Sequence, residues 1–285
     1  MLPIVDTHQH LWDLSRFHLP WVDTRPPLAR SFLPEDYRLA TDGLNVVKCV
    51  YMEVDLDPRH RQGEADYVIE LCAGARTATI AAVVCGEPGS EGFATYAAQF
   101  KGSKYVKGLR RVLHVPETPP GTCLSKEFIR DVRLLGTLGL SFDLCMRAVE
   151  LADADRLVGD CPDTRFILDH CGNAEVHKVG PERDQWRKDM EAIARRPNLV
   201  GKVSGIVASA KPGQWGPDDL APIVNHTLDV FGPDRVMFGG DWPVCTVAAT
   251  YRQWVDALKA IVHNRPEEAR RQLFHDNAVR FYGLA

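Results

Sequence analysis

Residues able to do chemistry first appear near the start of the chain, in the segment Asp6-Thr7-His8-Gln9-His10. Alternate side chains of a β-strand point to the same face, so Asp6, His8 and His10 are expected to face one way. Two imidazoles on one face can hold a metal ion together or hydrogen-bond a substrate oxygen. A satisfied polar pair at the rim of a sheet would look the same, so the pattern needs further partners.

Two later segments supply such partners. Residues 166–172 (FILDHCG) contain His170, and residues 238–243 (FGGDWP) contain Asp241. Taken singly, His170 could be an ordinary residue of a loop that leads into a helix, and Asp241 a turn residue after two glycines. A third imidazole and a carboxylate nevertheless complete a set that suits a mononuclear metal site, or a general base beside electrophilic groups. We therefore predict that His8, His10, His170 and Asp241 form a catalytic site.

Short apolar runs rich in β-forming residues could carry these side chains on strands. They alternate with segments of helical periodicity, which implies parallel strands joined by right-handed crossovers. No break in composition divides the 285 residues, and eight units of this length fit a closed barrel better than an open sheet. The sequence therefore predicts an α/β fold, a (β/α)8 TIM-like barrel forming one domain over residues 1–285. The predicted strands are Ile4–His8, Val46–Val54, Thr79–Cys85, Val106–Leu113, Leu140–Met146, Arg165–His170, Leu199–Ser204 and Arg235–Gly239.

The closed barrel explains how distant segments could meet. Active sites of this fold lie at the mouth formed by the C-terminal ends of the strands. The first and eighth strands become neighbours on closure, which would bring Asp241 beside His8 and His10. His170, at the end of the sixth strand, would reach in from across the mouth.

Two parts of the chain depart from the plain repeat. The first connection, from about Leu11 to Asp42, is far longer than an ordinary loop and carries several aromatic residues. We predict that this long βα loop forms a lid or a wall of the substrate site. The last segments, Pro266–Leu273 and Asp276–Tyr282, are predicted to be helices that close the bottom or side of the barrel.

Composition narrows the classes of partner. With 45% hydrophobic and 25% charged residues, and a net charge of -4 without long charge runs, the chain is a poor candidate for nucleic-acid binding. The eight cysteines are scattered without a CxxC motif and are expected to be free thiols of a reducing compartment. No segment has the roughly 18 apolar residues that span a bilayer, and no signal peptide is recognisable at the start. We therefore expect a cytoplasmic protein that acts on a small molecule and is compatible with a homo-oligomer.

Motifs along nearly the whole chain resemble those of a known superfamily. The sequence resembles the amidohydrolase superfamily, in the amidohydrolase-related branch that includes L-fuconolactonase-type and rhamnonolactonase-type sugar lactonases and 2-pyrone-4,6-dicarboxylate lactonase. The matching segments are 5–12 (VDTHQHLW), 107–110 (KGLR), 169–172 (DHCG), 202–205 (KVSG), 238–243 (FGGDWP) and 277–283 (NAVRFYG).

The resemblance implies hydrolysis of a sugar-acid lactone, with Asp241 as general base for the attacking water. His8, His10 and His170 would polarise the carbonyl, either through one divalent ion, preferably zinc, or by hydrogen bonds in a metal-independent enzyme. In the metal case Asp241 would join the three histidines as a ligand. An alternative is a metal-dependent decarboxylase or hydratase of an aromatic or muconate-type acid, but residues 141–146 of the fifth strand lack the histidine expected there. A non-catalytic barrel that binds a sugar acid is a third possibility, disfavoured because the whole polar set is present.

Residues at other strand ends are candidates for substrate binding. Arg110 is expected to project inward and bind substrate oxygens, or to anchor its own strand end through a salt bridge. Glu53 could bind sugar hydroxyls or orient a histidine, and Trp12, Trp242 and His114 could contribute to the pocket. Only one arginine can be placed at the mouth from the sequence, which favours a neutral sugar lactone over a pyrone dicarboxylate.

Overall fold

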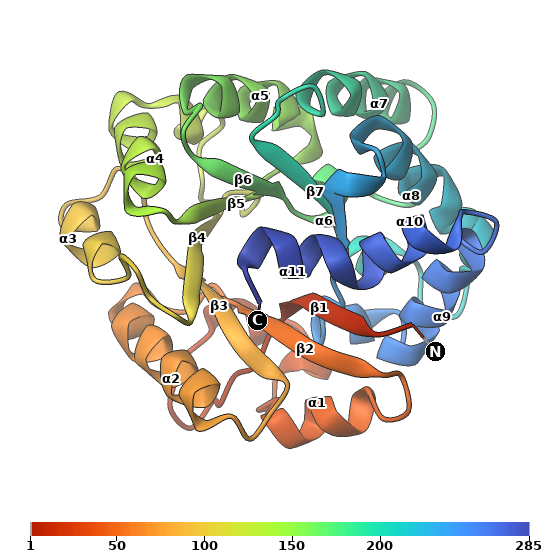
Figure 1. The fold of residues 1–285 in the computed structure, drawn as a ribbon, viewed down its shortest axis with the longest axis horizontal. Coiled ribbons are helices and arrows are strands. Elements are labelled where there is room, and N and C mark those ends of the chain that lie inside the picture. Colours follow the sequence, from red (N-terminus) through yellow and green to blue (C-terminus); the bar gives the residue numbers. More distant parts are fainter. Residues whose placement is uncertain (1, 285) are drawn as a thin grey trace.

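Eight parallel strands form the centre of the protein, whose computed structural model describes residues 2–284 (Figure 1). They follow one another around the sheet in sequence order, and helices surround them, so the fold is the predicted (β/α)8 barrel. Each observed strand lies within or close to a predicted one. The strands are β1 (Ile4–Gln9), β2 (Val46–Met52), β3 (Thr79–Cys85), β4 (Val106–Val112), β5 (Ser141–Cys145), β6 (Arg165–Leu168), β7 (Leu199–Val203) and β8 (Val236–Phe238).

Closure of the barrel occurs through residues just beyond the regular part of β8. The backbone N–H of Asp241 donates to the carbonyl of His8 at 2.8 Å, and the N–H of His10 donates to the carbonyl of Trp242 at 2.8 Å. The hydroxyl of Thr7 donates to the carbonyl of Phe238 at 2.7 Å. The seam between the first and last strands therefore runs through the segments predicted to carry the site.

Helices cover the outside of the barrel (Figure 1). Helical periodicity between the predicted strands indicated the longer helices after β2, but it did not reveal α3 or the four-residue α6. Within residues 2–284, no helix has both the length and the apolar character needed to cross a membrane. The helices are α1 (Pro34–Ala40), α2 (Arg61–Gly74), α3 (Phe93–Ala98), α4 (Lys126–Leu138), α5 (Leu151–Asp160), α6 (His170–Asn173), α7 (Pro181–Ile193), α8 (Pro217–Phe231), α9 (Tyr251–Ile261), α10 (Glu267–Arg271) and α11 (Asn277–Tyr282).

The long first connection is not a plain loop, because it contains α1. The Asp36 carboxylate accepts a hydrogen bond from the N–H of Leu33 at 2.9 Å and so caps the start of this helix. The rest of the connection is tied down by its tryptophans. Trp12 donates to the carbonyl of Arg30 at 2.6 Å, and Trp21 donates to the carbonyl of Val54 beyond β2 at 2.8 Å.

The bottom of the barrel is closed by α11, as predicted for the end of the chain. Ala278 and Tyr282 of α11 pack with interior residues of several strands in one buried cluster (Figure 1). The strand residues of this cluster are Val5, Val50, Met52, Ala81, Val83 and Met237. Burying apolar groups here leaves only the opposite end of the barrel for polar side chains.

Candidate active site

His8 faces the barrel interior because β1 is irregular. Pairing with β2 shifts register after Asp6, so the simple two-residue alternation is interrupted. The Asp6 carboxylate accepts hydrogen bonds from the hydroxyls of Tyr37 on α1 at 2.7 Å and Tyr251 on α9 at 3.0 Å, both in the helix layer. The Nδ1 atom of His8 instead lies 3.4 Å from Nζ of Lys202 on β7. The prediction that Asp6 and His8 share a face is therefore wrong.

Asp241 follows β8 with a backbone φ of 53°, in the left-handed region that residues with side chains rarely adopt. The two glycines before it are needed for space. A Cβ atom on Gly239 would lie 2.7 Å from Cβ of His8, and one on Gly240 would lie 2.5 Å from the Asp6 carboxylate. The glycines thus allow the end of β8 to approach β1 closely enough to place Asp241 beside His8.

His170 reaches the site from the end of β6. Its backbone also has a φ of 53°, and its Nδ1 lies 2.9 Å from the hydroxyl of Ser204, which follows β7. A side chain on Gly205 would collide with the imidazole of His170. The Ser204-Gly205 pair therefore fixes one edge of the ring and leaves room for the other.

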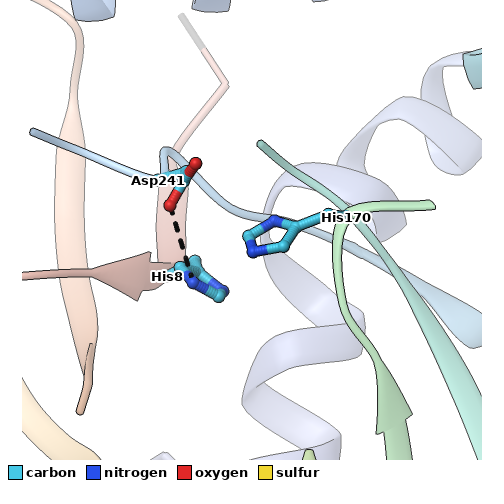
Figure 2. A group of neighbouring side chains, drawn as sticks. All are labelled: His8, His170 and Asp241. Atoms are coloured by element: carbon cyan, nitrogen blue, oxygen red, sulfur yellow. Dashed lines mark ion pairs between the residues drawn. The ribbon is translucent and has the colours of Figure 1, made fainter. Parts of the chain in front are cut away.

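The four residues predicted to be catalytic come together at the mouth. Asp241 Oδ1 lies 3.7 Å from Nε2 of His8 and 3.3 Å from Nε2 of His10, and Figure 2 shows the ring of His170 facing His8 and Asp241 from the side. The ring centres of His8 and His170 are 4.5 Å apart. Ligand atoms of His8, His170 and Asp241 all lie within 4.8 Å of one another, whereas His10 is not in this group. Nδ1 of His10 is instead 2.9 Å from the carbonyl of Met52.

Arg110 projects inward from β4, as predicted, and is held there by Glu53. Nε of Arg110 donates to the Glu53 carboxylate at 2.6 Å, and its Nη1 lies 3.3 Å from Nε2 of His8. The other Glu53 oxygen accepts the N–H of Asp55 at 2.7 Å. Glu53 is thus a buried support for Arg110 and does not line the cavity described below.

A buried charge network, which the sequence did not reveal, lies directly beneath His8. Lys202 of β7 donates a hydrogen bond to Asp143 of β5 at 2.9 Å and forms an ion pair with Asp169 at 2.8 Å. Asp169 in turn lies 3.5 Å from Nδ1 of His8 and 3.4 Å from Nη1 of Arg110. The indication of this network in the sequence was a lysine within the otherwise apolar seventh strand. All of these side chains are almost fully buried.

Burial favours the neutral form of two histidines of this site, His8 and His170. Burial lowers the pKa of His8 well below its ordinary value, because the nearby Asp169 does not compensate for lost solvation. Burial likewise lowers the pKa of His170. For Asp169 itself burial opposes ionisation, but Lys202 and His8 hold its pKa well below the usual range. Neutral imidazoles beside an ionised carboxylate can bind a metal ion or accept and donate hydrogen bonds to a substrate.

A cavity of about 910 Å³ opens above this cluster. Of the predicted substrate-binding residues, Arg110 and His114 line it, together with Asp241, His170 and His10. Trp12 and Trp242 do not line it, because both rings pack against Phe32 in the first connection. Trp21, Asp55 and Asn173 do line it.

The cavity wall carries more positive charge than the sequence indicated. Arg25, Arg147, Lys178 and Arg183 line it in addition to Arg110, so the prediction of a single arginine is wrong. Several of these cations already have partners within the protein. Arg147 pairs with Glu150 and Lys178 with Glu182, each at 2.8 Å, and Arg183 donates to backbone carbonyls. The additional cations were not predicted because they belong to loops and to α7. The pattern of strands in the sequence does not define where these elements lie.

Comparison with known proteins shows to which family the chain belongs. The family model described as amidohydrolase matches residues 5–284. The chain belongs to the amidohydrolase family.

Individual members of the amidohydrolase family match over almost their full length. An L-fucono-1,5-lactonase from Burkholderia multivorans is 29% identical, covering 98% of this chain and 96% of the relative. An L-rhamnono-gamma-lactonase from Scheffersomyces stipitis is 23% identical, covering 99% and 98%. The crystal structure of an amidohydrolase from Burkholderia multivorans with bound zinc superposes with a TM-score of 0.87 at 24% identity, covering 99% of this chain and 100% of that one.

The donor set of this amidohydrolase fits one divalent cation. His8, His170 and Asp241 offer two nitrogens and a carboxylate oxygen within 4.8 Å of one another. Around them, two buried basic side chains face four buried carboxyl groups, so acidic groups outnumber basic ones even though burial raises the pKa of Asp143 to about 7. These groups are Arg110 and Lys202 on one side and Glu53, Asp143, Asp169 and Asp241 on the other. Nη1 of Arg110 lies 3.3 Å from Nε2 of His8. An ion held by this nitrogen would replace that contact.

Glu64 of α2 should make the stability of the amidohydrolase depend on pH. It accepts hydrogen bonds from the Tyr51 hydroxyl and the Val54 N–H, both at 2.9 Å, and burial raises its pKa from 4.5 to about 8. Between these values the folded protein holds a proton that the unfolded chain releases, so stability falls as pH rises through this window. Glu64→Gln should remove that loss, on the order of a few kcal/mol.

Chemical denaturation at pH 5 and pH 8.5 would measure this effect. The exposed Glu70 lies on the same helix and provides a control, because Glu70→Gln should leave the pH dependence unchanged. An equally steep fall in the free energy of unfolding for wild type and Glu64→Gln would contradict the assignment.

Proposed function

We propose that this amidohydrolase opens the ring of a sugar-acid lactone, an aldono-1,4- or 1,5-lactone such as L-fucono-1,5-lactone. The observation that carries the proposal is the Asp241 carboxylate, which lines a large cavity while lying 3.3 Å from His10 and 3.7 Å from His8. A general base must stand close to the attacking water and to groups that stabilise developing negative charge. The lactonase names of relatives at 29% and 23% identity support the same chemistry.

The proposed reaction uses Asp241 twice. Asp241 takes a proton from water as the water oxygen attacks the lactone carbonyl carbon. When the tetrahedral intermediate collapses, the bond between that carbon and the ring oxygen breaks, and Asp241 passes its proton to the leaving oxygen. The product is an open-chain hydroxy acid, and one carboxylate serves both transfers.

The groups around Asp241 have supporting roles in this proposal. His10, whose Nε2 lies 3.3 Å from Oδ1, orients the carboxylate. Arg110 lines the cavity and can hydrogen-bond the carbonyl oxygen as it becomes negative. His170 also lines the cavity and would do the same in a metal-independent enzyme, because only one of its ring nitrogens is not at Ser204. Asp169, at 3.5 Å from Nδ1 of His8, fixes the orientation of the imidazole.

We also propose that His8, His170 and Asp241 hold one divalent ion, with zinc the best match to two nitrogens and one oxygen. When bound, such an ion would act as a Lewis acid that polarises the lactone carbonyl. Purified protein should contain about one ion per chain. Chelation should lower both activity and melting temperature, and added zinc should restore them. Full activity in protein whose measured metal content is negligible would overturn this part.

The rival functions fit the site less well. Decarboxylation or hydration of an aromatic acid is disfavoured because β5, Ser141–Cys145, places no histidine at the mouth. A non-catalytic binding barrel would have no need for two strained residues, His170 and Asp241, aimed at one point.

A panel of L- and D-aldono-1,4- and 1,5-lactones tests the proposed function most directly. Acid release followed with a pH indicator should identify at least one lactone that is hydrolysed. Carbon dioxide release from hydroxylated aromatic acids should stay at the background level. Turnover of an aromatic acid together with inertness toward every lactone would replace the proposal with the decarboxylase function.

A further inference from the structure

The segment Glu53-Val54-Asp55, just beyond β2, forms a rigid part of the cavity wall. The N–H of Val54 donates to Glu64 of α2 at 2.9 Å, and its carbonyl accepts from the indole of Trp21 at 2.8 Å. The N–H of Asp55 donates to Glu53 at 2.7 Å. Hydrogen bonds to α2, to the first connection and within the segment itself therefore hold it in place.

The backbone of Asp55 has a φ of 49°, in the left-handed region. Residues other than glycine occupy this region rarely, although Asp and Asn tolerate it better than most. Strained conformations of this kind cluster at functional sites, where neighbouring contacts keep them in place. The hydrogen bonds around Val54 and Glu53 provide such contacts here.

The same segment is connected to the proposed catalytic centre through Arg110. Glu53 accepts from Nε of Arg110 at 2.6 Å and its carbonyl accepts from Nη2 at 2.8 Å, while Nη1 of the same guanidinium lies 3.3 Å from His8. The position of Asp55 is thus fixed relative to His8 by a short chain of contacts. A substrate atom at the catalytic centre and a group near Asp55 would be held at a defined separation.

The carboxyl group of Asp55 is free to bind a ligand. It lines the cavity, and within residues 2–284 it makes no hydrogen bond or ion pair through its side chain. Burial raises its pKa to about 7, with the negative charge of Glu53 acting in the same direction. A carboxyl group with this pKa can accept hydrogen bonds from hydroxyls when ionised and donate one when protonated. Trp21 also lines the cavity, and its aromatic ring lies 5.6 Å from that of Trp12 between ring centres, with the guanidinium of Arg25 at 5.7 Å from its centre.

We propose that Asp55 and Trp21 form a substrate-binding subsite that recognises the hydroxyl groups of a polyhydroxylated lactone. Asp55 hydrogen-bonds ring or side-chain hydroxyls, and Trp21 packs against the C–H face of the same sugar. The inference deepens the proposed lactonase function and rests on it. It names the feature by which the enzyme would distinguish a sugar lactone from an unsubstituted one.

A purely structural role for Asp55 makes a different prediction. If Asp55 merely occupied a left-handed turn, Asn would serve equally well, because Asn adopts this backbone conformation with similar ease. Asp55→Asn therefore keeps the turn and the shape of the side chain while removing the ionisable carboxyl group. Loss of a hydrogen bond to a charged group lowers affinity by about 10- to 100-fold.

Calorimetric titration with L-fuconate, the open-chain product of L-fucono-1,5-lactone, and with hexanoate, the unhydroxylated acid of equal chain length, tests the subsite. Asp55→Asn should weaken L-fuconate binding by about 10-fold or more. It should not weaken hexanoate binding, because hexanoate carries no hydroxyl group for Asp55 to bind. The control Asp23→Asn changes an exposed residue of the first connection and should leave both affinities unchanged.

Several results would overturn the subsite. These are a change in L-fuconate affinity below about threefold, an equal weakening for hexanoate, or no detectable binding of L-fuconate and its epimers to the wild type. Binding needs no turnover, so failure of the proposed function is recognised separately. An enzyme inert toward every lactone that still binds L-fuconate through Asp55 would lose the lactonase proposal and keep the subsite.

A matched pair of variants tests Trp21. Both Trp21→Phe and Trp21→Leu lose the hydrogen bond to Val54, but only the first retains an aromatic ring. L-fuconate should bind more weakly to Trp21→Leu than to Trp21→Phe. Equal affinities of the two variants would remove Trp21 from the subsite.

Discussion

Replacing Asp241 by Asn should lower kcat for lactone hydrolysis by about 10³-fold. The amide cannot take a proton from water or return one to the leaving oxygen, so both transfers assigned to Asp241 fail. Asn tolerates the left-handed backbone at this position and keeps the size of the side chain. The N–H that donates to the His8 carbonyl at 2.8 Å belongs to the backbone and is unaffected. The fold should therefore persist while catalysis is lost.

Steady-state kinetics and thermal denaturation of the same preparation would separate these effects. Asp256, an exposed residue of α9, provides the matched control, because Asp256→Asn makes the same chemical change far from the cavity. The control should keep wild-type kcat. An Asp241→Asn protein with kcat within about tenfold of wild type would exclude Asp241 as the general base.

Loss of the ammonium group in Lys202→Met should destabilise the protein by about 3–5 kcal/mol. Lys202 neutralises Asp143 at 2.9 Å and Asp169 at 2.8 Å, and all three side chains are fully buried. Without the ammonium group, two carboxylates would face each other in the interior with no cation between them. Asp169 would keep the guanidinium of Arg110, at 3.4 Å, and the imidazole of His8, at 3.5 Å.

A second substitution distinguishes charge imbalance from loss of packing. Adding Asp143→Asn to Lys202→Met removes one negative charge along with the positive one, so the double variant should recover part of the lost stability. Urea denaturation measures both free energies of unfolding. Lys178→Met disrupts an ion pair with Glu182 whose side chains are 39% and 62% exposed, and it should change stability by less than about 1 kcal/mol. A similarly small effect for Lys202→Met would show that the network contributes little.

The fold could be predicted because its signal is repetitive. Each strand is a short apolar run between amphipathic segments, and eight such units leave few alternatives to a closed barrel. The irregularity of β1 could not be predicted, because it depends on how Asp6 is drawn outward by Tyr37 and Tyr251, which come from opposite ends of the chain. The helix α1 was missed because aromatic and proline residues around it suggested a long loop.

The candidate site could be predicted only in part, because some of its residues are placed by contacts between elements far apart in the sequence. His8 lies near the end of β1, and His10, His170 and Asp241 lie just beyond the ends of strands. Strand ends converge at the mouth by topology alone. Lys202 lies within β7, and its role depends on Asp143 of β5 and on Asp169, which directly follows β6. The additional cations of the cavity wall and Asp55 lie on connections whose paths follow from tertiary contacts such as the hydrogen bond between Trp21 and Val54.

The seam between β1 and β8 also orders events during biosynthesis. Asp241 and Trp242 emerge from the ribosome more than 200 residues after His8 and His10, yet the backbone bonds that close the barrel join these two segments. A nascent or truncated chain that ends before residue 241 lacks both the closing bonds and the proposed base. Activity can therefore arise only once nearly the whole chain has been made and the ring has closed. Recovery of activity on refolding should accordingly require that the seam between β1 and β8 has formed.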